Sequence, residues 1–213
     1  MNEINLTPQP PLHCVERGSR AQRDGGEVDH NTITLESESG TNVMLPYSFP
    51  EKREQSFALA DWVKQWFERR GDVLEVRDVQ EDPFFYYMGD LMIVRGGGVV
   101  QFIEVKCESS YTRHDTENLA IERYSSIERQ TPGGPWHTDA DFYVHIYADG
   151  LLVVMSRRKL VAWIESELAR DANAFPYRQI PNQGWTTGTY LVPRSRAKAA
   201  LGEWYREYEA AGH

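Results

Sequence analysis

Three residues near the middle of this 213-residue chain have the types and spacing that metal-dependent phosphate chemistry needs. Asp90 stands at the start of one predicted strand, and Glu104 and Lys106 stand near the end of the next. Because side chains alternate faces along a strand, Glu104 and Lys106 share one face. Mg²⁺ prefers carboxylate oxygens and water as ligands, and a bound ion polarises a phosphodiester and activates water. A lysine beside it can orient that water or stabilise charge that develops on phosphate.

A glycine-rich turn should bring the three residues together. Residues 95–98 read Arg-Gly-Gly-Gly and separate two apolar runs, so the pattern predicts an antiparallel hairpin. Folding the chain at this turn places the start of the first strand beside the end of the second, which brings Asp90 level with Glu104 and Lys106. Two carboxylates and an ammonium on one sheet face are costly to bury unless they are paired or hold a cation.

Gly89-Asp90, followed after a hairpin's length by Glu104-Val105-Lys106, resembles the core motif of the PD-(D/E)XK, or restriction-endonuclease-like, nuclease superfamily. Gly89 stands where the family name has Pro, at a position that varies. The later blocks at 118–122 and 140–144 look like the segments that follow the active-site strand in phage- and mobile-element-encoded members.

The resemblance implies a mixed central β-sheet flanked by helices, with the core order α-β-β-β-α-β. It implies a nuclease that hydrolyses DNA phosphodiester bonds and uses Mg²⁺ or Mn²⁺ as its cofactor. The catalytic residues are then Asp90, Glu104 and Lys106. The metal ligands are Asp90, Glu104, the carbonyl of Val105, and Asp61 on the preceding helix.

Each assignment has a plainer alternative. Glu-Val-Lys is also common on half-exposed strands whose charges face water. Asp61 borders the apolar face of its helix and is equally a boundary residue, and Glu122 is either a further metal-site acid or a structural residue. The alternative function is a catalytically inactive nuclease fold that binds nucleic acid or protein, and a third is an unrelated α/β protein with a chance motif. The intact Asp90, Glu104 and Lys106 triplet favours the nuclease, because a degenerate copy would have lost one of them.

The elements that must position these residues follow from hydrophobic periodicity. Apolar residues at helical spacing after Ser56, a helix-capping residue, predict a helix over 57–70 that Gly71 ends. A loop carrying Pro176, Pro181 and Gly184 is expected before the last strand. The predicted strands are 73–76, 89–94, 99–107, 118–124, 141–147, 151–155 and 190–192, and the later helices are 156–169 and 195–211.

The first 55 residues differ from the rest of the chain. They are rich in Pro, Gly, Ser, Asn and charge, a composition typical of a disordered or loosely attached arm. Segments 32–35 and 42–45 are β-prone and could pair as a small hairpin. We therefore predict a polar arm over 1–55 and one nuclease-like domain over 56–213.

Two predicted helices begin with cations, against the preference of the helix dipole for anions at that end. The first begins with Arg157, Arg158 and Lys159, and the last with Arg194 and Arg196. Cations and backbone N–H groups can grip phosphate together at such a place. These five residues are therefore candidates for DNA binding, and the alternative is that they are ordinary exposed charges of little energetic cost.

Composition limits where the protein works and what it binds. A net charge of −9 argues against a strongly basic nucleic-acid binder, although metal-binding carboxylates contribute to that number. Two cysteines at positions 14 and 107 form no zinc or disulfide pattern, which indicates a reducing compartment. No apolar run has the length of a membrane helix or a signal peptide. The expectation is a cytoplasmic protein with DNA as its partner and no membrane, and homodimer formation is left open.

Overall fold

The computed structural model describes residues 49–85, 87–108, 112–182 and 184–209, all within a compact unit that runs from Leu45 to His213. The predicted hairpin over 32–35 and 42–45, and nearly all of the predicted arm, lie outside these residues. The first helix begins at Phe49, earlier than predicted. Its second residue is Pro50, and proline is tolerated in a first helical turn because the backbone N–H that it lacks has no partner there.

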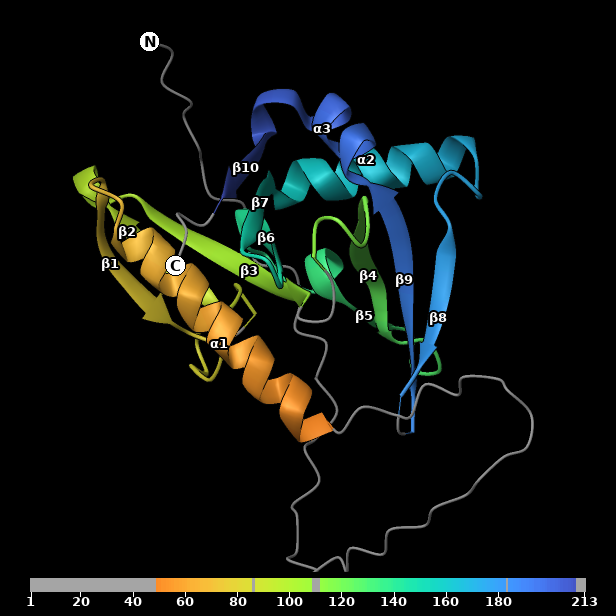
Figure 1. Cartoon of the computed structure of the whole chain (residues 1–213), viewed down its shortest axis with the longest axis horizontal. Helices are drawn as coiled ribbons and strands as arrows, with labels where there is room; N and C mark the ends of the chain where they lie inside the picture. The colour runs from red at the N-terminus through yellow and green to blue at the C-terminus, as the bar shows by residue number, and fades with distance from the viewer. Residues whose placement is uncertain (1–48, 86, 109–111, 183, 210–213) are drawn as a thin grey trace, which may run out of the picture. The chain divides into compact units, whose positions relative to one another are not determined.

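The elements follow one another in an order that mixes helices with two sets of strands (Figure 1). They are α1 (Phe49–Glu68), β1 (Val73–Asp78), β2 (Leu91–Arg95), η1 (Gly96–Gly98), β3 (Val100–Glu108), β4 (Asn118–Ser126), β5 (Thr131–Pro132), η2 (Gly134–Trp136), β6 (Phe142–Tyr147), β7 (Leu151–Ser156), α2 (Arg157–Arg170), β8 (Tyr177–Pro181), β9 (Thr186–Pro193), α3 (Arg194–Leu201), η3 (Gly202–Trp204) and β10 (Tyr205–Glu209).

These strands form two sheets. The larger has six strands in the order β1-β2-β3-β6-β7-β10, and its β3–β6 pair is parallel while its other pairs are antiparallel. The smaller is antiparallel, in the order β5-β4-β9-β8. The predicted α/β class with a mixed sheet is confirmed. After β3, however, the chain enters the second sheet at β4, and the next α-helix comes only after β7, so it does not follow a simple α-β-β-β-α-β succession.

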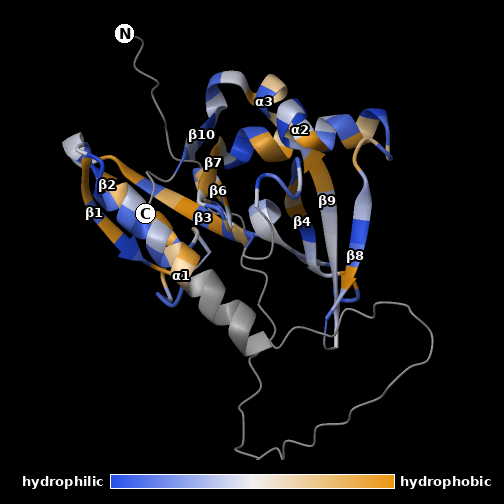
Figure 2. Ribbon diagram, viewed as in Figure 1, coloured by the Kyte–Doolittle hydropathy of each residue, from blue (hydrophilic) through white to orange (hydrophobic). Residues whose placement is uncertain are grey.

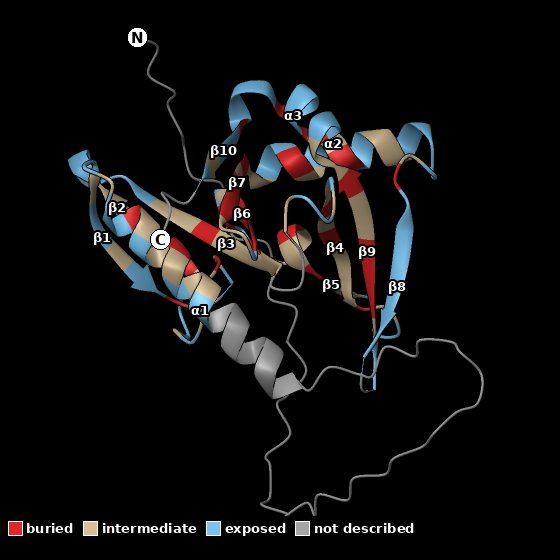
Figure 3. Cartoon of the chain, in the orientation of Figure 1, coloured by how far each residue is buried: buried red, intermediate tan, exposed pale blue. Residues whose placement is uncertain are grey.

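The larger sheet is covered on both faces. On one face, Val63 and Phe67 of α1 pack against Leu91, Ile93 and Ile103. On the other, apolar residues of β6 and β7 pack with α2, α3 and the β4–β9 pair of the second sheet. Strands β6 and β7 are therefore buried on both faces, and they read as nearly continuous apolar runs (Figures 2 and 3).

The C-terminal prediction was wrong beyond residue 201. Helix α3 ends at Leu201, and the following Gly202 takes a positive φ of 54°, which other residues adopt at a cost. The chain then turns through η3 and adds β10 to the edge of the larger sheet, where Tyr205 pairs with Met155. Burial in β10 does not alternate, because Tyr205 is buried and Glu207 is exposed, so the pairing with β7 rather than the residue pattern makes this segment a strand.

The loop predicted around residues 176–184 was also wrong in part. Residues 177–181 form β8, whose residues are all exposed, and β9 begins at Thr186, earlier than predicted. Pro181 fits at the end of an edge strand, where no ladder hydrogen bond is lost. Within the part of the chain that is described, no helix has both the length and the apolar character needed to cross a bilayer.

Candidate active site

The predicted hairpin is confirmed, and it places Glu104 and Lys106 on one sheet face. The register pairs Leu91 with Ile103, and both residues are buried under α1. Glu104 and Lys106, at alternate positions of β3, therefore point to the opposite face. Asp90 stands just before β2 and is placed by its hydrogen bonds to β3, so its closeness to Glu104 stays a prediction.

A glycine kink precedes Asp90, at the position where the motif that this segment resembles has proline. Gly89 has a φ of 143°, and a Cβ atom at this position would lie 2.6 Å from the carbonyl oxygen of Ile103. A proline, whose φ is fixed near −65°, does not fit this backbone. The chain thus approaches β3 so closely that only glycine is accommodated before Asp90.

The carboxylate of Asp90 takes the place of the missing strand. The Asp90 N–H donates to the Ile103 carbonyl at 2.8 Å, and the Val105 N–H donates to Asp90 Oδ2 at 2.7 Å. The N–H and C=O groups of one strand residue point to the same side, so the Val105 carbonyl is also directed to the side of β3 on which Asp90 lies. This is consistent with the prediction that the carbonyl belongs to the site.

Burial makes the Asp90 carboxylate costly to ionise. It raises the pKa of Asp90 from 3.8 to about 6, against the lowering effect of the Val105 N–H, and the negative charge of Asp78 raises it further. A cation beside the carboxylate would reverse this balance, because an opposite charge stabilises the ionised form.

Asp90 should therefore make the metal-free protein less stable as the pH rises. Its pKa is higher in the fold than in an ordinary chain, so the folded state holds the proton more tightly. The stabilising contribution is complete below about pH 4 and is lost as the pH rises through 6, and it amounts to about 3 kcal/mol at most. Urea unfolding in EDTA between pH 4.5 and 7.5 measures it. Asp90→Asn should remove this part of the pH dependence, and identical curves for the variant and the wild type would contradict the assignment.

The predicted metal ligand Asp61 does not join the other acidic residues. Among the described residues, no group of three or more His, Cys, Asp and Glu side chains is placed to hold a metal, so Asp61 does not complete such a group with Asp90 and Glu104. Asp61 is exposed on α1, and that helix covers the opposite face of the hairpin. Mg²⁺ often uses only one or two carboxylates and keeps several waters, so a site with Asp90 and Glu104 alone stays a prediction.

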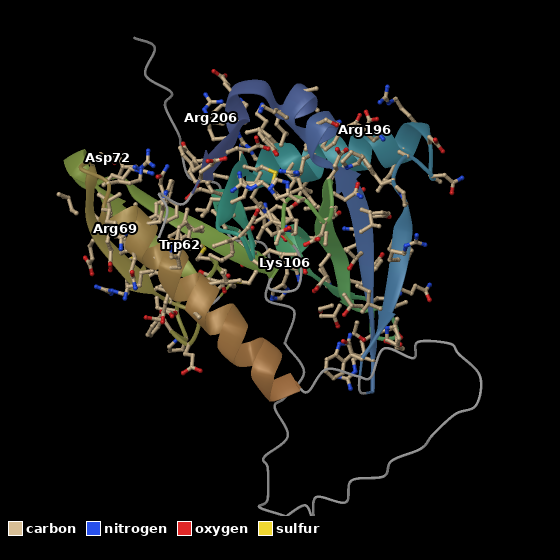
Figure 4. All side chains as sticks on the ribbon, viewed as in Figure 1. Trp62, Arg69, Asp72, Lys106, Arg196 and Arg206 are labelled. Atoms are coloured by element: carbon tan, nitrogen blue, oxygen red, sulfur yellow. The ribbon has the colours of Figure 1, made fainter. Side chains whose placement is uncertain are left out.

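Lys106 has a partner in the second sheet that the sequence argument did not foresee. Its Nζ lies 3.8 Å from Oε2 of Glu122 on β4, and Figure 4 shows Lys106 between β3 and that sheet. Burial raises the pKa of Glu122, and the positive charge of Lys106 lowers it. Glu122 had been left open as a metal-site acid or a structural residue. It contacts the lysine of the site.

Two further polar residues lie on this face. On β6, Tyr143 pairs in register with Glu104, and His145 pairs with Lys106. Both are fully buried, and among the described residues neither the Tyr143 hydroxyl nor the His145 nitrogens have a hydrogen-bond partner. Burial, with the nearby charges of Lys106 and Arg194, lowers the pKa of His145 to about 3, so its ring is neutral. Sequence reasoning passed over Tyr143, although the alternation of strand residues could have located it.

Arg157, a predicted DNA contact, is engaged within the protein. Its guanidinium donates to the carbonyl oxygens of Pro135, at 2.7 Å, and of Thr138, and it lies 3.5 Å from Asp139. These contacts tie the start of α2 to the loop before β6. In contrast, its neighbours Arg158 and Lys159 are exposed.

Arg194 and Arg196 are likewise held by protein groups. Arg194 donates to the Arg113 carbonyl at 3.0 Å. Arg196 donates to the Ala174 carbonyl at 2.7 Å and to Glu167 at 2.8 Å. Of the five candidate cations, Arg158 and Lys159 are therefore the best placed to bind phosphate.

The two kinds of cation should respond differently to substitution. Arg157→Ala leaves two carbonyls without their donor, so we expect a loss of about 2–3 kcal/mol in unfolding free energy.

The double variant Arg158→Gln, Lys159→Gln should unfold like the wild type. It should bind DNA more weakly and flatten the plot of log K against log salt by up to ~0.9 per lost contact. Denaturant unfolding measures the stability of each variant, and a salt titration measures DNA binding by the double variant. An unfolding free energy of Arg157→Ala equal to that of the wild type would contradict the structural role of Arg157.

A scan of protein-family models and searches of curated proteins and of solved structures found no match to this chain.

Proposed function

We propose that this chain is a metal-dependent deoxyribonuclease that hydrolyses DNA phosphodiester bonds. The observation that supports the proposal is the β2–β3 hairpin, in which Asp90 accepts a hydrogen bond from the Val105 N–H of β3, between Glu104 and Lys106 in the chain. The proposal includes that the mixed sheet is related to the restriction-endonuclease-like fold. In the expected order α-β-β-β-α-β a helix follows the third strand, whereas in this chain β4 of the second sheet follows β3.

In this proposal the carboxylates of Asp90 and Glu104 hold Mg²⁺ or Mn²⁺, and the Val105 carbonyl is a third protein ligand. A bound ion of this kind polarises the phosphate and lowers the pKa of a coordinated water. The Val105 N–H keeps Asp90 in a fixed orientation, because it donates to Oδ2. Lys106 positions the attacking water and offers hydrogen bonds to the negative charge that develops on phosphate. The water oxygen would join phosphorus as the bond to one sugar oxygen breaks, the water would lose a proton to solvent, and the departing sugar oxygen would take a proton from solvent.

A cleavage assay on supercoiled plasmid tests the proposal. Wild-type protein should nick the plasmid with Mg²⁺ or Mn²⁺ and not with EDTA. The matched control is Glu104→Gln protein purified in the same way, which excludes a contaminating nuclease. Cleavage in EDTA, or equal cleavage by this variant, would refute the proposed site. A parallel panel of linear, nicked, flapped, junction and single-stranded DNA would identify the substrate.

A second candidate is a nuclease-like fold that binds nucleic acid or protein without turnover. It is favoured by the ion pair between Lys106 and Glu122, because the carboxylate already balances the positive charge of the ammonium in the absence of phosphate. DNA binding without cleavage under every metal condition would support this alternative over the nuclease.

A further inference from the structure

Glu122 reaches the site from a different sheet. Lys106 belongs to β3 of the six-stranded sheet, whereas Glu122 belongs to β4 and pairs with Thr189 of β9 in the smaller sheet. Their contact at 3.8 Å therefore depends on how the two sheets pack. Both side chains are partly shielded, with exposed fractions of 34% for Lys106 and 22% for Glu122, so the attraction is screened less than in an open surface pair.

Two glycines pack closely against Glu122. A Cβ atom at Gly133 would lie 2.5 Å from Oε1 and 2.7 Å from Cγ of Glu122, so only glycine allows this approach. At Gly134 a Cβ atom would lie 3.1 Å from the Glu122 carbonyl oxygen. The Gly133 N–H also donates to the Arg123 carbonyl at 3.0 Å, which anchors the segment to β4. The Gly133 backbone thus packs against one side of the Glu122 side chain and removes some of the positions open to its carboxylate, which lowers the side-chain entropy lost on pairing with Lys106.

We propose that Glu122 is a positioning residue that holds the Lys106 ammonium where the proposed reaction needs it. This inference rests on the proposed function. Lysine carries its charge at the end of a flexible four-carbon side chain. The position of Lys106 on β3 determines only the sheet face on which the side chain lies. A carboxylate on a second sheet supplies the missing constraint. Glu122 itself contacts neither the proposed metal nor the phosphate, and it acts through Lys106.

A double-mutant cycle tests this role. Glu122→Gln should lower kcat for plasmid nicking about 10- to 100-fold, the effect typical of groups that orient an active-site residue. The KM for DNA and the midpoint of metal-induced stabilisation should stay unchanged. In a Lys106→Ala background, measured at high enzyme over hours, Glu122→Gln should cause no further loss, because its partner is gone. An equal loss in both backgrounds, or an unchanged kcat, would overturn the proposal.

The neighbouring Glu165 provides a matched control. Glu165 pairs at 3.3 Å with Arg123, the residue that follows Glu122 in the chain, whereas Lys106 pairs with Glu122. Glu165→Gln should leave kcat at the wild-type value, and thermal unfolding should show that every variant is folded. A drop in kcat as large as that of Glu122→Gln would indicate a general effect of removing charge and would overturn the specific role.

Lysine labelling separates this inference from the proposed function. An amine-reactive reagent followed by mass spectrometry reports Lys106 in the absence of any catalysis. Labelling of Lys106 should be faster in Glu122→Gln and unchanged in Glu165→Gln, because an ion-paired ammonium must leave its carboxylate before it reacts. If the wild type does not cleave DNA, the nuclease proposal fails, and labelling alone decides the positioning role. Equal labelling in the wild type and Glu122→Gln would overturn it.

Discussion

Glu104→Gln is expected to abolish DNA cleavage while leaving the fold and DNA binding intact. The amide keeps the shape of the side chain and removes one of the two negative charges proposed to hold the metal. Losing several kcal/mol of transition-state stabilisation corresponds to a fall in rate of at least about 10³-fold. In the wild type, Mg²⁺ should raise the melting temperature as its concentration passes its Kd, and this rise should be much smaller in the variant.

Glu108→Gln is the matched control for this experiment. Glu108 lies on the same strand and the same face as Glu104, two residues beyond Lys106, and it is not part of the proposed metal pair. Its substitution removes the same charge and should leave both cleavage and the metal-induced rise in melting temperature close to wild type. If Glu104→Gln retains full activity, or if both variants fail alike, the assignment of the metal site is wrong.

Lys106→Ala should separate metal binding from chemistry. The carboxylates of Asp90 and Glu104 remain, so Mg²⁺ should still raise the melting temperature. Cleavage should fall about 10²- to 10³-fold, the usual cost of removing a group that stabilises developing charge. The measurements are nicking rates and thermal unfolding across a metal titration.

Lys64→Ala is a suitable companion variant. Lys64 lies on α1, where its amine is 4.0 Å from Glu68 in an exposed pair, and α1 covers the opposite face of the hairpin. Its substitution should change neither cleavage nor stability appreciably, because exposed pairs contribute little. Loss of metal-induced stabilisation in Lys106→Ala would show instead that the lysine organises the carboxylates.

Local features made the centre of the site predictable. The glycine-rich turn at 95–98 and the two apolar runs beside it determine the hairpin, and the hairpin brings Asp90 beside Ile103 and Val105 of β3. The kink at Gly89 was harder to foresee, because it depends on how closely the backbone approaches Ile103. The distance between Gly89 and the Ile103 backbone is set by the folded chain, and the residue types of the motif do not indicate it.

Long-range contacts explain what sequence reasoning missed. The pairing of Lys106 with Glu122 joins two sheets, and nothing in the spacing of these residues indicates it. Similarly, Arg157 appeared to offer its charge to solvent, although two backbone carbonyls receive its hydrogen bonds. The last segment was predicted as one helix because the composition of residues 195–211 permits it. Instead, the turn at Gly202 ends α3, and the following residues pair with the free edge of β7 as strand β10.

The connection between β3 and β6 has a consequence for how the protein folds. These neighbouring parallel strands are separated by β4 and β5, and β4 in turn pairs with β9, with Asn118 opposite Pro193. Contacts between residues so distant in sequence form slowly, because the entropy of closing the chain is lost before the contacts form. The contacts between β2 and β3 themselves are local and can form early, whereas those of the hairpin with β6 and α1 are not local. We therefore expect the hairpin to place Asp90 beside β3 before the second sheet delivers Glu122 to Lys106.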